Sequence, residues 1–463
     1  MATFQYHGAT SSDLRLNDLV SRLLKISNKS NIKKLSDSLG EDAQLYLVGG
    51  VVRDAARCKE ALDIDIASIL PPEEICKRLS KANIDWVPTG VEHGTVLAVV
   101  DAQHIEITTF RMPGPRVSNC PNKWSSSIEQ DLEGRDFTIN AIAFDFKNNK
   151  IIDPFSGLSD IQSGVVRSVK NPKLRFEEDP LRILRMIRFG PAQGFKIEEA
   201  TFNAAKDLIK NLSSISVERI RDEFLKILLS DKASDGLRNL RSLGLLDSIL
   251  PEIVPSYNFE QNDYHWLDVF EHTLAVIDHT PKNELLRLTA LFHDLGKPHT
   301  LSVGDDGKRH FYKHEIKSTD LTKDALLRLK LPKQTIKHVS HLVRLHMRPL
   351  NCGPVGMRRL MRDLGDLLND WLLFKEADSL GAKVVKSDFD EAKIKFLEVY
   401  NKEKNRASSF LKLSISGDDL KEIGIKEGPE LGKILSQLRN KVLRDPSINN
   451  REMLLNLVKS EIT

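Results

Sequence analysis

Leu47-Val48-Gly49-Gly50-Val51-Val52-Arg53-Asp54, followed by Leu62-Asp63-Ile64-Asp65-Ile66-Ala67, is the part of this 463-residue chain that decides its fold. Residues 45–48 predict a short buried strand, which two glycines end and a helix follows. Glycine lets the backbone approach a ligand closely, and the first turn of a helix offers free N–H groups to a phosphate. Gly49 and Gly50 are therefore candidates for nucleotide binding, and the guanidinium of Arg53 falls where it can reach a triphosphate.

The two acidic residues of the second segment predict a metal site. Alternate residues of a strand share one face, so Asp63 and Asp65 point the same way while Ile64 and Ile66 point into the core. Paired carboxylates beside a phosphate-binding turn suit Mg²⁺, and two such ions can clamp an in-line phosphoryl transfer. A DxD pair or a double glycine alone is commonly a turn, but their conjunction at short spacing is far more specific.

This conjunction resembles the signature of the nucleotidyltransferase superfamily that includes DNA polymerase beta. The wording over residues 47–67 resembles its class II tRNA nucleotidyltransferase and bacterial poly(A) polymerase branch. The resemblance implies an α/β catalytic head, Mg²⁺ as the cofactor, CTP and ATP as substrates, and tRNA as the partner.

Bulk composition narrows the class of protein. The chain is too long for one compact core, so several domains are expected. The net charge is only +3, so a nucleic-acid surface must be a local patch. Four cysteines lie far apart without a CxxC pair, which favours free thiols in a reducing cytoplasm, and no apolar run approaches a membrane span. We therefore expect a cytoplasmic enzyme outside membranes; the pattern favours no particular oligomeric state.

The remainder of the head is expected to carry a helix, a hairpin and a long loop. The predicted helix and hairpin cover Glu73–Lys81, then Thr95–Val100 and His104–Phe110. Glu106 lies on the polar face of its strand and is a candidate third catalytic carboxylate, or else an exposed strand residue. Prolines, glycine and serines make residues 111–133 a loop. In the resembled family, a flexible loop at this point helps to switch between CTP and ATP.

Gly134-Arg135-Asp136-Phe137-Thr138-Ile139-Asn140-Ala141 resembles the family sequence RRDFTINA, with glycine in place of the first arginine. Apolar residues alternate with polar ones here, which predicts a half-buried strand. The resemblance implies that Arg135 contacts the phosphates or sugar of the incoming nucleotide, and that Asp136 and Asn140 position it. A structural ion pair is the alternative for these residues.

A helix with a row of arginines is predicted next. Asp179 followed by Pro180 is typical of a helix start. At 100° per residue the apolar side chains and the arginines fall on opposite arcs. The two arcs consist of Ile183, Leu184 and Ile187, and of Arg182, Arg185 and Arg188.

This helix resembles the family motif EDxxRxxR, in which Asp and Arg hydrogen-bond the edge of the incoming base. Carried over, the resemblance implies that Asp179 and Arg182 read the base, while Arg185 and Arg188 support them or hold phosphate. Cytosine and adenine each offer an amino donor beside an acceptor, which suits an accepting Asp and a donating Arg. Arg219, in Val217–Glu223, matches a further family helix with no assigned role.

A second constellation of His and Asp residues resembles the HD superfamily of metal-dependent phosphohydrolases. The matching residues are His272, His293, Asp294 and Asp378 for one metal, with His314 and His346 (or His341) completing a second site. Imidazoles with carboxylates suit a divalent transition metal that activates water. Residues 321–363, with ten Lys/Arg against two Asp/Glu, form a candidate basic patch for the tRNA backbone, or else a solvated helical face.

The expected fold class is α+β: a polymerase-beta-like α/β head followed by an all-helical neck, an HD helical domain and a helical tail. The predicted boundaries are 1–40 (helical extension), 41–155 (head), 156–250 (neck), 251–385 (HD domain) and 386–463 (tRNA-binding tail).

The predicted function is template-independent CCA addition to the 3′ end of tRNA from CTP and ATP, with release of pyrophosphate. A-only addition, CC-only addition and poly(A) synthesis are alternatives within the class. An HD phosphohydrolase whose head only holds RNA, and a non-catalytic RNA-binding protein, are alternatives of other classes.

Overall fold

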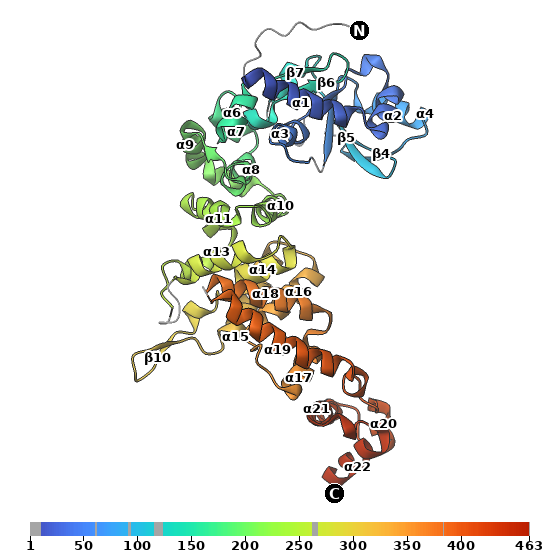
Figure 1. Cartoon of the computed structure of the whole chain (residues 1–463), viewed down its shortest axis with the longest axis vertical. Coiled ribbons are helices and arrows are strands. Elements are labelled where there is room, and N and C mark those ends of the chain that lie inside the picture. Colours follow the sequence, from blue (N-terminus) through green and yellow to red (C-terminus); the bar gives the residue numbers. More distant parts are fainter. Residues whose placement is uncertain are drawn as a thin grey trace. The chain divides into compact units, whose positions relative to one another are not determined.

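The computed structural model of the chain describes residues 11–60, 63–90, 94–114, 124–261, 267–382 and 384–462, which form two compact units, residues 1–245 and 246–463 (Figure 1). Leu62 and the centre of the predicted loop, residues 115–123 with Cys120, lie outside the described residues.

A seven-stranded mixed sheet forms the centre of the first unit, with the order β3-β4-β5-β2-β1-β6-β7. Its strands are β1 (Tyr46–Val48), β2 (Ile64–Ser68), β3 (Asp85–Gly90), β4 (Thr95–Val100), β5 (Gln103–Thr109), β6 (Ala143–Asp145) and β7 (Lys150–Ile152). Strand β1 runs antiparallel to β2 and β6, whereas β2 runs parallel to β5. The parallel register sets Asp65 opposite Glu106, so two acidic residues meet in the middle of the sheet.

One face of the sheet is covered by helices α1 (Ser11–Ser27), α2 (Ser30–Leu39), α3 (Gly50–Ala56) and α4 (Pro72–Lys81). Their apolar residues share one core with the strands, in which Leu35, Val51, Ile66 and Ile107 are buried. The predicted strand at 45–48, the hairpin and the helix over 73–81 are confirmed. Ile64 and Ile66 point into the core as expected, which leaves Asp65 for the opposite face.

The strand predicted within residues 134–141 is wrong. Residues Thr138–Asn140 form a 3₁₀ turn instead. The Asp136 carboxylate accepts hydrogen bonds from the Phe137 N–H and the Asn140 amide, and such local bonds compete with strand pairing. The polar residues of the alternation are therefore buried like the apolar ones.

Helices continue the first unit after the sheet. They are α5 (Ile128–Glu133), α6 (Gly157–Ser163), α7 (Pro172–Glu178), α8 (Arg182–Phe189), α9 (Glu199–Leu208), α10 (Val217–Leu228) and α11 (Ala233–Ser242). The predicted arginine helix begins at Arg182, not at Asp179. Asp179 is extended, with φ −151° and ψ 97°, because a following proline disfavours the helical conformation.

The second unit is almost entirely helical. It contains α13 (Val269–His279), α14 (Glu284–Phe292), α15 (His314–Arg328), α16 (Lys333–Leu345), α17 (Pro354–Leu364), α18 (Leu368–Gly381), α19 (Lys386–Lys404), α20 (Gly417–Glu422), α21 (Pro429–Arg444) and α22 (Arg451–Ile462), and a small hairpin of β10 (Ser302–Val303) and β11 (Arg309–His310). A core around Trp371, Phe396 and Phe410 joins α16 through α22. Within the described ranges, no helix is both long and apolar enough to cross a membrane.

Candidate active site

The glycine turn between β1 and α3 is closely surrounded by charged side chains. Gly49 has φ +67°, a conformation that favours glycine. A Cβ atom at Gly49 would lie 2.8 Å from Nη1 of Arg135 and 3.9 Å from Oδ2 of Asp65. A Cβ atom at Gly50 would lie 3.8 Å from Nη2 of Arg53 and 3.9 Å from the same Asp65 oxygen. Two arginines and one carboxylate therefore converge on a turn that has no room for a side chain at Gly49.

The predicted acidic residues gather on the sheet beside this turn. Asp65 is half-buried in β2, while Asp63 and Glu106 are exposed. Burial and then the charge of Glu106 raise the pKa of Asp65 to about 6, with Asp63 adding and Arg135 opposing. A half-buried carboxylate with acidic neighbours gains most from a bound cation, so these residues fit a hard divalent metal. They are not among the compact groups of three ligand atoms found in the described part of the chain.

A hydrogen-bonded chain links the turn to helix α8. Arg53 donates from Nη1 to Oδ1 of Asn140 at 2.8 Å, and Asn140 donates from Nδ2 to Oδ1 of Asp136 at 3.0 Å. Arg185 donates from Nε to Oδ2 of Asp136 at 2.7 Å. Burial raises the pKa of the Asp136 carboxyl, but the Arg185 charge and the Asn140 hydrogen bond outweigh it, so the pKa lies well below its usual value. Asp136 thus holds Arg185 and Asn140 in place.

The arginines of this site share an aromatic ring that the motifs did not single out. The guanidinium carbons of Arg53, Arg185 and Arg188 lie 4.9, 5.2 and 4.2 Å from the ring centroid of Phe189. Cations are attracted to the face of an aromatic ring, so Phe189 helps to gather three like charges. The only signal in the sequence is an aromatic residue directly after the arginine row.

Glu223 on α10 was also missed as a member of the site. This buried carboxylate lies 3.2 Å from Nε of Arg188 and 3.7 Å from Nη1 of Arg185. Burial and the nearby Arg185 charge lower the pKa of Arg188 to about 10, although Glu223 opposes them. Helix α10 is therefore fastened to α8 by ion pairs.

The two residues expected to read the base do not pair with each other. Arg182 is buried and donates from Nη1 to the Arg175 carbonyl and to Glu178, and from Nη2 to the Gly134 carbonyl. Asp179 instead accepts from Nη2 of Arg219, at 3.1 Å on Oδ1 and 2.9 Å on Oδ2. The expected exposed row of arginines is therefore wrong at Arg182, which turns into the protein.

The six His and Asp residues predicted in the HD constellation come together in the second unit. They form two compact groups, His272 with His293 and Asp378, and Asp294 with His314 and His346. Nε2 of His293 lies 3.3 Å from Nε2 of His272, and Nε2 of His314 lies 3.1 Å from Nε2 of His346.

Asp294 joins the two groups through its two oxygens. Its Oδ2 lies 3.2 Å from Nε2 of His293, and its Oδ1 lies 3.2 Å from Nε2 of His314. Nδ1 of His293 lies 2.8 Å from the Ala290 carbonyl, and Nδ1 of His314 lies 2.8 Å from the Phe311 carbonyl. Donation from Nδ1 to these carbonyls leaves Nε2 as the free lone pair, the tautomer a metal ligand needs.

The charges around this cluster fit a cation. Burial raises the pKa of Asp294, but the charges of His293 and Lys297 lower it further, to well below its usual value. Nζ of Lys297 lies 2.6 Å from Oδ2 of Asp294. Of the two candidates on α16, His346 belongs to the cluster, whereas the Nε2 of His341 contacts the Asp363 carbonyl elsewhere.

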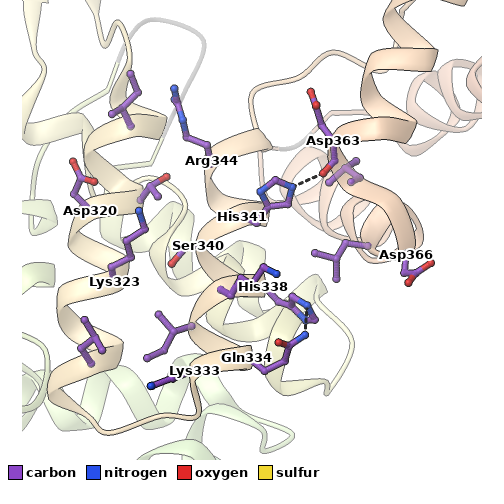
Figure 2. Close-up of a pocket in the computed structure, with 17 residues that line it drawn as sticks. Asp320, Lys323, Lys333, Gln334, His338, Ser340, His341, Arg344, Asp363 and Asp366 are labelled. Atoms are coloured by element: carbon purple, nitrogen blue, oxygen red, sulfur yellow. Dashed lines mark hydrogen bonds between the residues drawn. The ribbon is translucent and has the colours of Figure 1, made fainter. Parts of the chain in front are cut away.

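A groove of about 1050 Å³ lies between α15, α16 and the end of α17 (Figure 2). It contains part of the predicted basic patch, namely Lys323, Lys333, Lys337 and Arg344. Three aspartates also line it, Asp320, Asp363 and Asp366. The patch is therefore interrupted by acidic groups, which confines a phosphate-binding surface to the lysine side of the groove.

The fold and site together define a nucleotidyltransferase head joined to a helical HD domain. A family model described as the poly(A) polymerase head domain matches residues 45–167. A model for the probable RNA and SrmB-binding site of polymerase A matches residues 194–256, and the HD domain model matches residues 262–387.

Curated relatives match most of the chain. A CCA-adding enzyme of Ligilactobacillus salivarius is 32% identical over 422 residues, 90% of this chain and 92% of that protein. An A-adding tRNA nucleotidyltransferase of Deinococcus radiodurans is 33% identical over 348 residues, 73% of this chain and 76% of that protein. The chain belongs to the tRNA nucleotidyltransferase family that these enzymes represent. Membership implies dependence on a divalent metal.

Solved structures support the fold. The CCA-adding enzyme of Bacillus stearothermophilus in complex with CTP superposes with a TM-score of 0.69 and 24% identity, covering 96% of this chain and 98% of that one. The Thermotoga maritima CCA-adding enzyme complexed with tRNA has a TM-score of 0.55 and 21% identity, covering 96% and 98%. The α+β fold class predicted from the sequence is confirmed.

Proposed function

We propose that this protein adds C and A nucleotides to the 3′ end of tRNA from CTP and ATP and releases pyrophosphate. The convergence of Asp65, Arg53 and Arg135 on the glycine turn carries the proposal, because it places carboxylates for a metal beside cations for a triphosphate. A relative named a CCA-adding enzyme, matched over nearly its full length, supports it. The A-adding relative keeps A-only addition as the main alternative, with CC-only addition and poly(A) synthesis behind it.

Each residue of the site has a role in this proposal. Asp63, Asp65 and Glu106 hold Mg²⁺, which when bound lowers the pKa of the RNA 3′-hydroxyl and neutralises the triphosphate. Gly49 and Gly50 leave room for the phosphates that Arg53 and Arg135 bind. Asp179 accepts a hydrogen bond from the amino group of the base, and α8 holds Arg185 and Arg188 in reach of the nucleotide.

Product length on a gel tests the proposal, with tRNA lacking its 3′ end, Mg²⁺, and CTP, ATP or both. A stop after the addition of C, C and A supports CCA addition. Incorporation of A only, C only or long A tails supports the corresponding alternative. Asp65→Asn should abolish incorporation, whereas Asp85→Asn, which changes an exposed aspartate on β3 of the same sheet, should not.

A second activity is proposed for the HD unit, metal-dependent hydrolysis of phosphate esters. The shared carboxylate Asp294 between two histidine pairs supports it, because such a ligand set can hold two metals side by side. Metal content and hydrolysis of p-nitrophenyl phosphate test it. Asp294→Asn should lose both metals and His346→Ala one, while His341→Ala, on the same helix, should lose neither. Retention of both metals in Asp294→Asn would refute the shared-ligand arrangement.

The lysine side of the groove is proposed as a contact for the tRNA backbone. Lys323, Lys333 and Lys337 project along it, and Lys side chains bind phosphates as point charges. The enzyme is proposed to work in the cytoplasm, where the described cysteines, which are all free thiols, stay reduced.

A further inference from the structure

The buried carboxylate of Asp179 is held by a residue from another helix. Arg219, on α10, donates to both Asp179 oxygens through Nη2. Asp179 is 6% exposed, whereas the side chain of Arg219 is 46% exposed. A carboxylate that is otherwise shielded from solvent is thus reached from the surface through one guanidinium.

Arg182, the other candidate for reading the base, is occupied. Two backbone carbonyls, of Arg175 and Gly134, and the Glu178 carboxylate accept its hydrogen bonds. The remaining nitrogens of Arg219, Nε and Nη1, have no acceptor among the residues that the structure describes. The donor available beside Asp179 is therefore Arg219.

We propose that Arg219 is a specificity-determining residue that, with Asp179, selects the base of the incoming nucleotide. The proposal rests on the proposed function and assigns the donor of the base-reading pair to α10 instead of α8. Asp179 accepts from the exocyclic amino group, and Arg219 donates to the adjacent ring nitrogen. Cytosine and adenine present a donor beside an acceptor at this edge. Uracil and guanine present a carbonyl beside an N–H, so both contacts fail for them.

The surrounding contacts connect this pair to the nucleotide site. Arg219 and Glu223 lie four residues apart, on one face of α10. Glu223 pairs with Arg185 and Arg188 of α8, and Arg185 binds Asp136 of the chain that ends at Arg53. The position of Arg219 is therefore fixed relative to the arginines proposed to hold the phosphates.

Two substitutions separate base reading from a structural role. Arg219→Ala removes the donor. Arg219→Lys keeps a positive charge beside Asp179 but loses the planar fork, so it should keep the fold and still fail to serve Asp179 and the base together. Lys206→Ala, which removes an exposed charge on α9, is the matched control.

The measurement is kcat and KM for CTP, ATP, UTP and GTP on tRNA lacking its 3′ end, with thermal unfolding of each variant. Both Arg219 variants should raise KM for CTP and ATP about tenfold and bring UTP incorporation about tenfold closer to that of CTP, the effect of one lost hydrogen bond to a charged group. Their kcat at saturating CTP should stay within about threefold of wild type, because the metal site is unchanged.

Three outcomes would overturn the inference. They are wild-type CTP-over-UTP preference in Arg219→Ala, wild-type preference in Arg219→Lys, and a fall in kcat and unfolding temperature without a change in preference. A wild-type enzyme that incorporates neither C nor A would instead refute the proposed function, so the two failures are distinguishable.

Discussion

Arg53 donates a hydrogen bond from Nη1 to Oδ1 of Asn140 across 2.8 Å, although 87 residues separate them in the chain. Asn140 uses its amide nitrogen for Asp136, which in turn binds Arg185. One neutral amide therefore stands between a cation of the glycine turn and a cation of α8. Because an amide has one accepting and one donating end, it can serve both neighbours, and a carboxylate at this position could not.

Asn140→Ala should raise KM for CTP and ATP about tenfold with a small change in kcat. Arg53 would lose an acceptor and with it a fixed orientation, and a hydrogen bond to a charged group contributes about 1.5–3 kcal/mol. Steady-state kinetics on tRNA lacking its 3′ end provide the measurement. Asn148→Ala, in an exposed turn, is the control and should behave as wild type. Unchanged KM in Asn140→Ala would mean that Asp54 alone orients Arg53.

Asp136→Asn should destabilise the protein by about 3 kcal/mol at neutral pH, because it leaves Arg185 without its buried partner. The pKa of Asp136 is lowered in the folded state, so its stabilisation is complete above the unfolded pKa of about 3.9 and is lost as the pH falls below it. Urea unfolding between pH 3 and 7 should show the wild-type advantage shrinking only below about pH 4. A constant gap across that range, or an equal loss in Asp85→Asn, would contradict this assignment.

The head could be predicted from the sequence because its pattern is local. Alternation in residues 62–67 fixes which side chains face the core, and paired glycines mark the turn. The neck could not, because the partners of Arg182 are two backbone carbonyls, which no side-chain pattern reveals. Asp179 was misplaced at a helix start because the effect of Pro180 on the residue before it was not weighed against the capping preference.

The HD cluster shows the same division. Residue types alone pointed to its ligands, since His and Asp in apolar helices suggest a metal site. The choice between His341 and His346 stayed open because both belong to one helical segment. Five residues apart, they are separated by 140° around the axis, so only one can face the cluster. Packing of α16 against α14 and α15 decides for His346, and the sequence does not show that packing.

Gly49→Ala should abolish nucleotide addition while the protein still folds. The added Cβ would lie 2.8 Å from Nη1 of Arg135 and would push that side chain from the turn. Gly164→Ala is a matched control, because Gly164 has φ +65° and open space around its Cβ position, so it carries the same backbone strain of about 1 kcal/mol without the clash. Nucleotide addition and unfolding temperature are measured for both. Equal activity in the two variants would show that the space at Gly49 is not needed.

Lys323→Ala should weaken tRNA binding and reduce its dependence on salt. Each phosphate contact contributes about 0.7–0.9 to the slope of log affinity against log salt concentration, so loss of one contact should lower the slope by about that amount. Lys317→Ala is the control, because Lys317 lies on the same helix but does not line the groove. Binding of labelled tRNA is measured between 50 and 200 mM KCl, about the range over which such contacts weaken strongly. If both variants lose the same affinity, the effect is general charge and the groove is not the contact. If Lys323→Ala alone changes the slope, a phosphate lies at the lysine side of the groove, and Lys333→Ala and Lys337→Ala should lower the slope further.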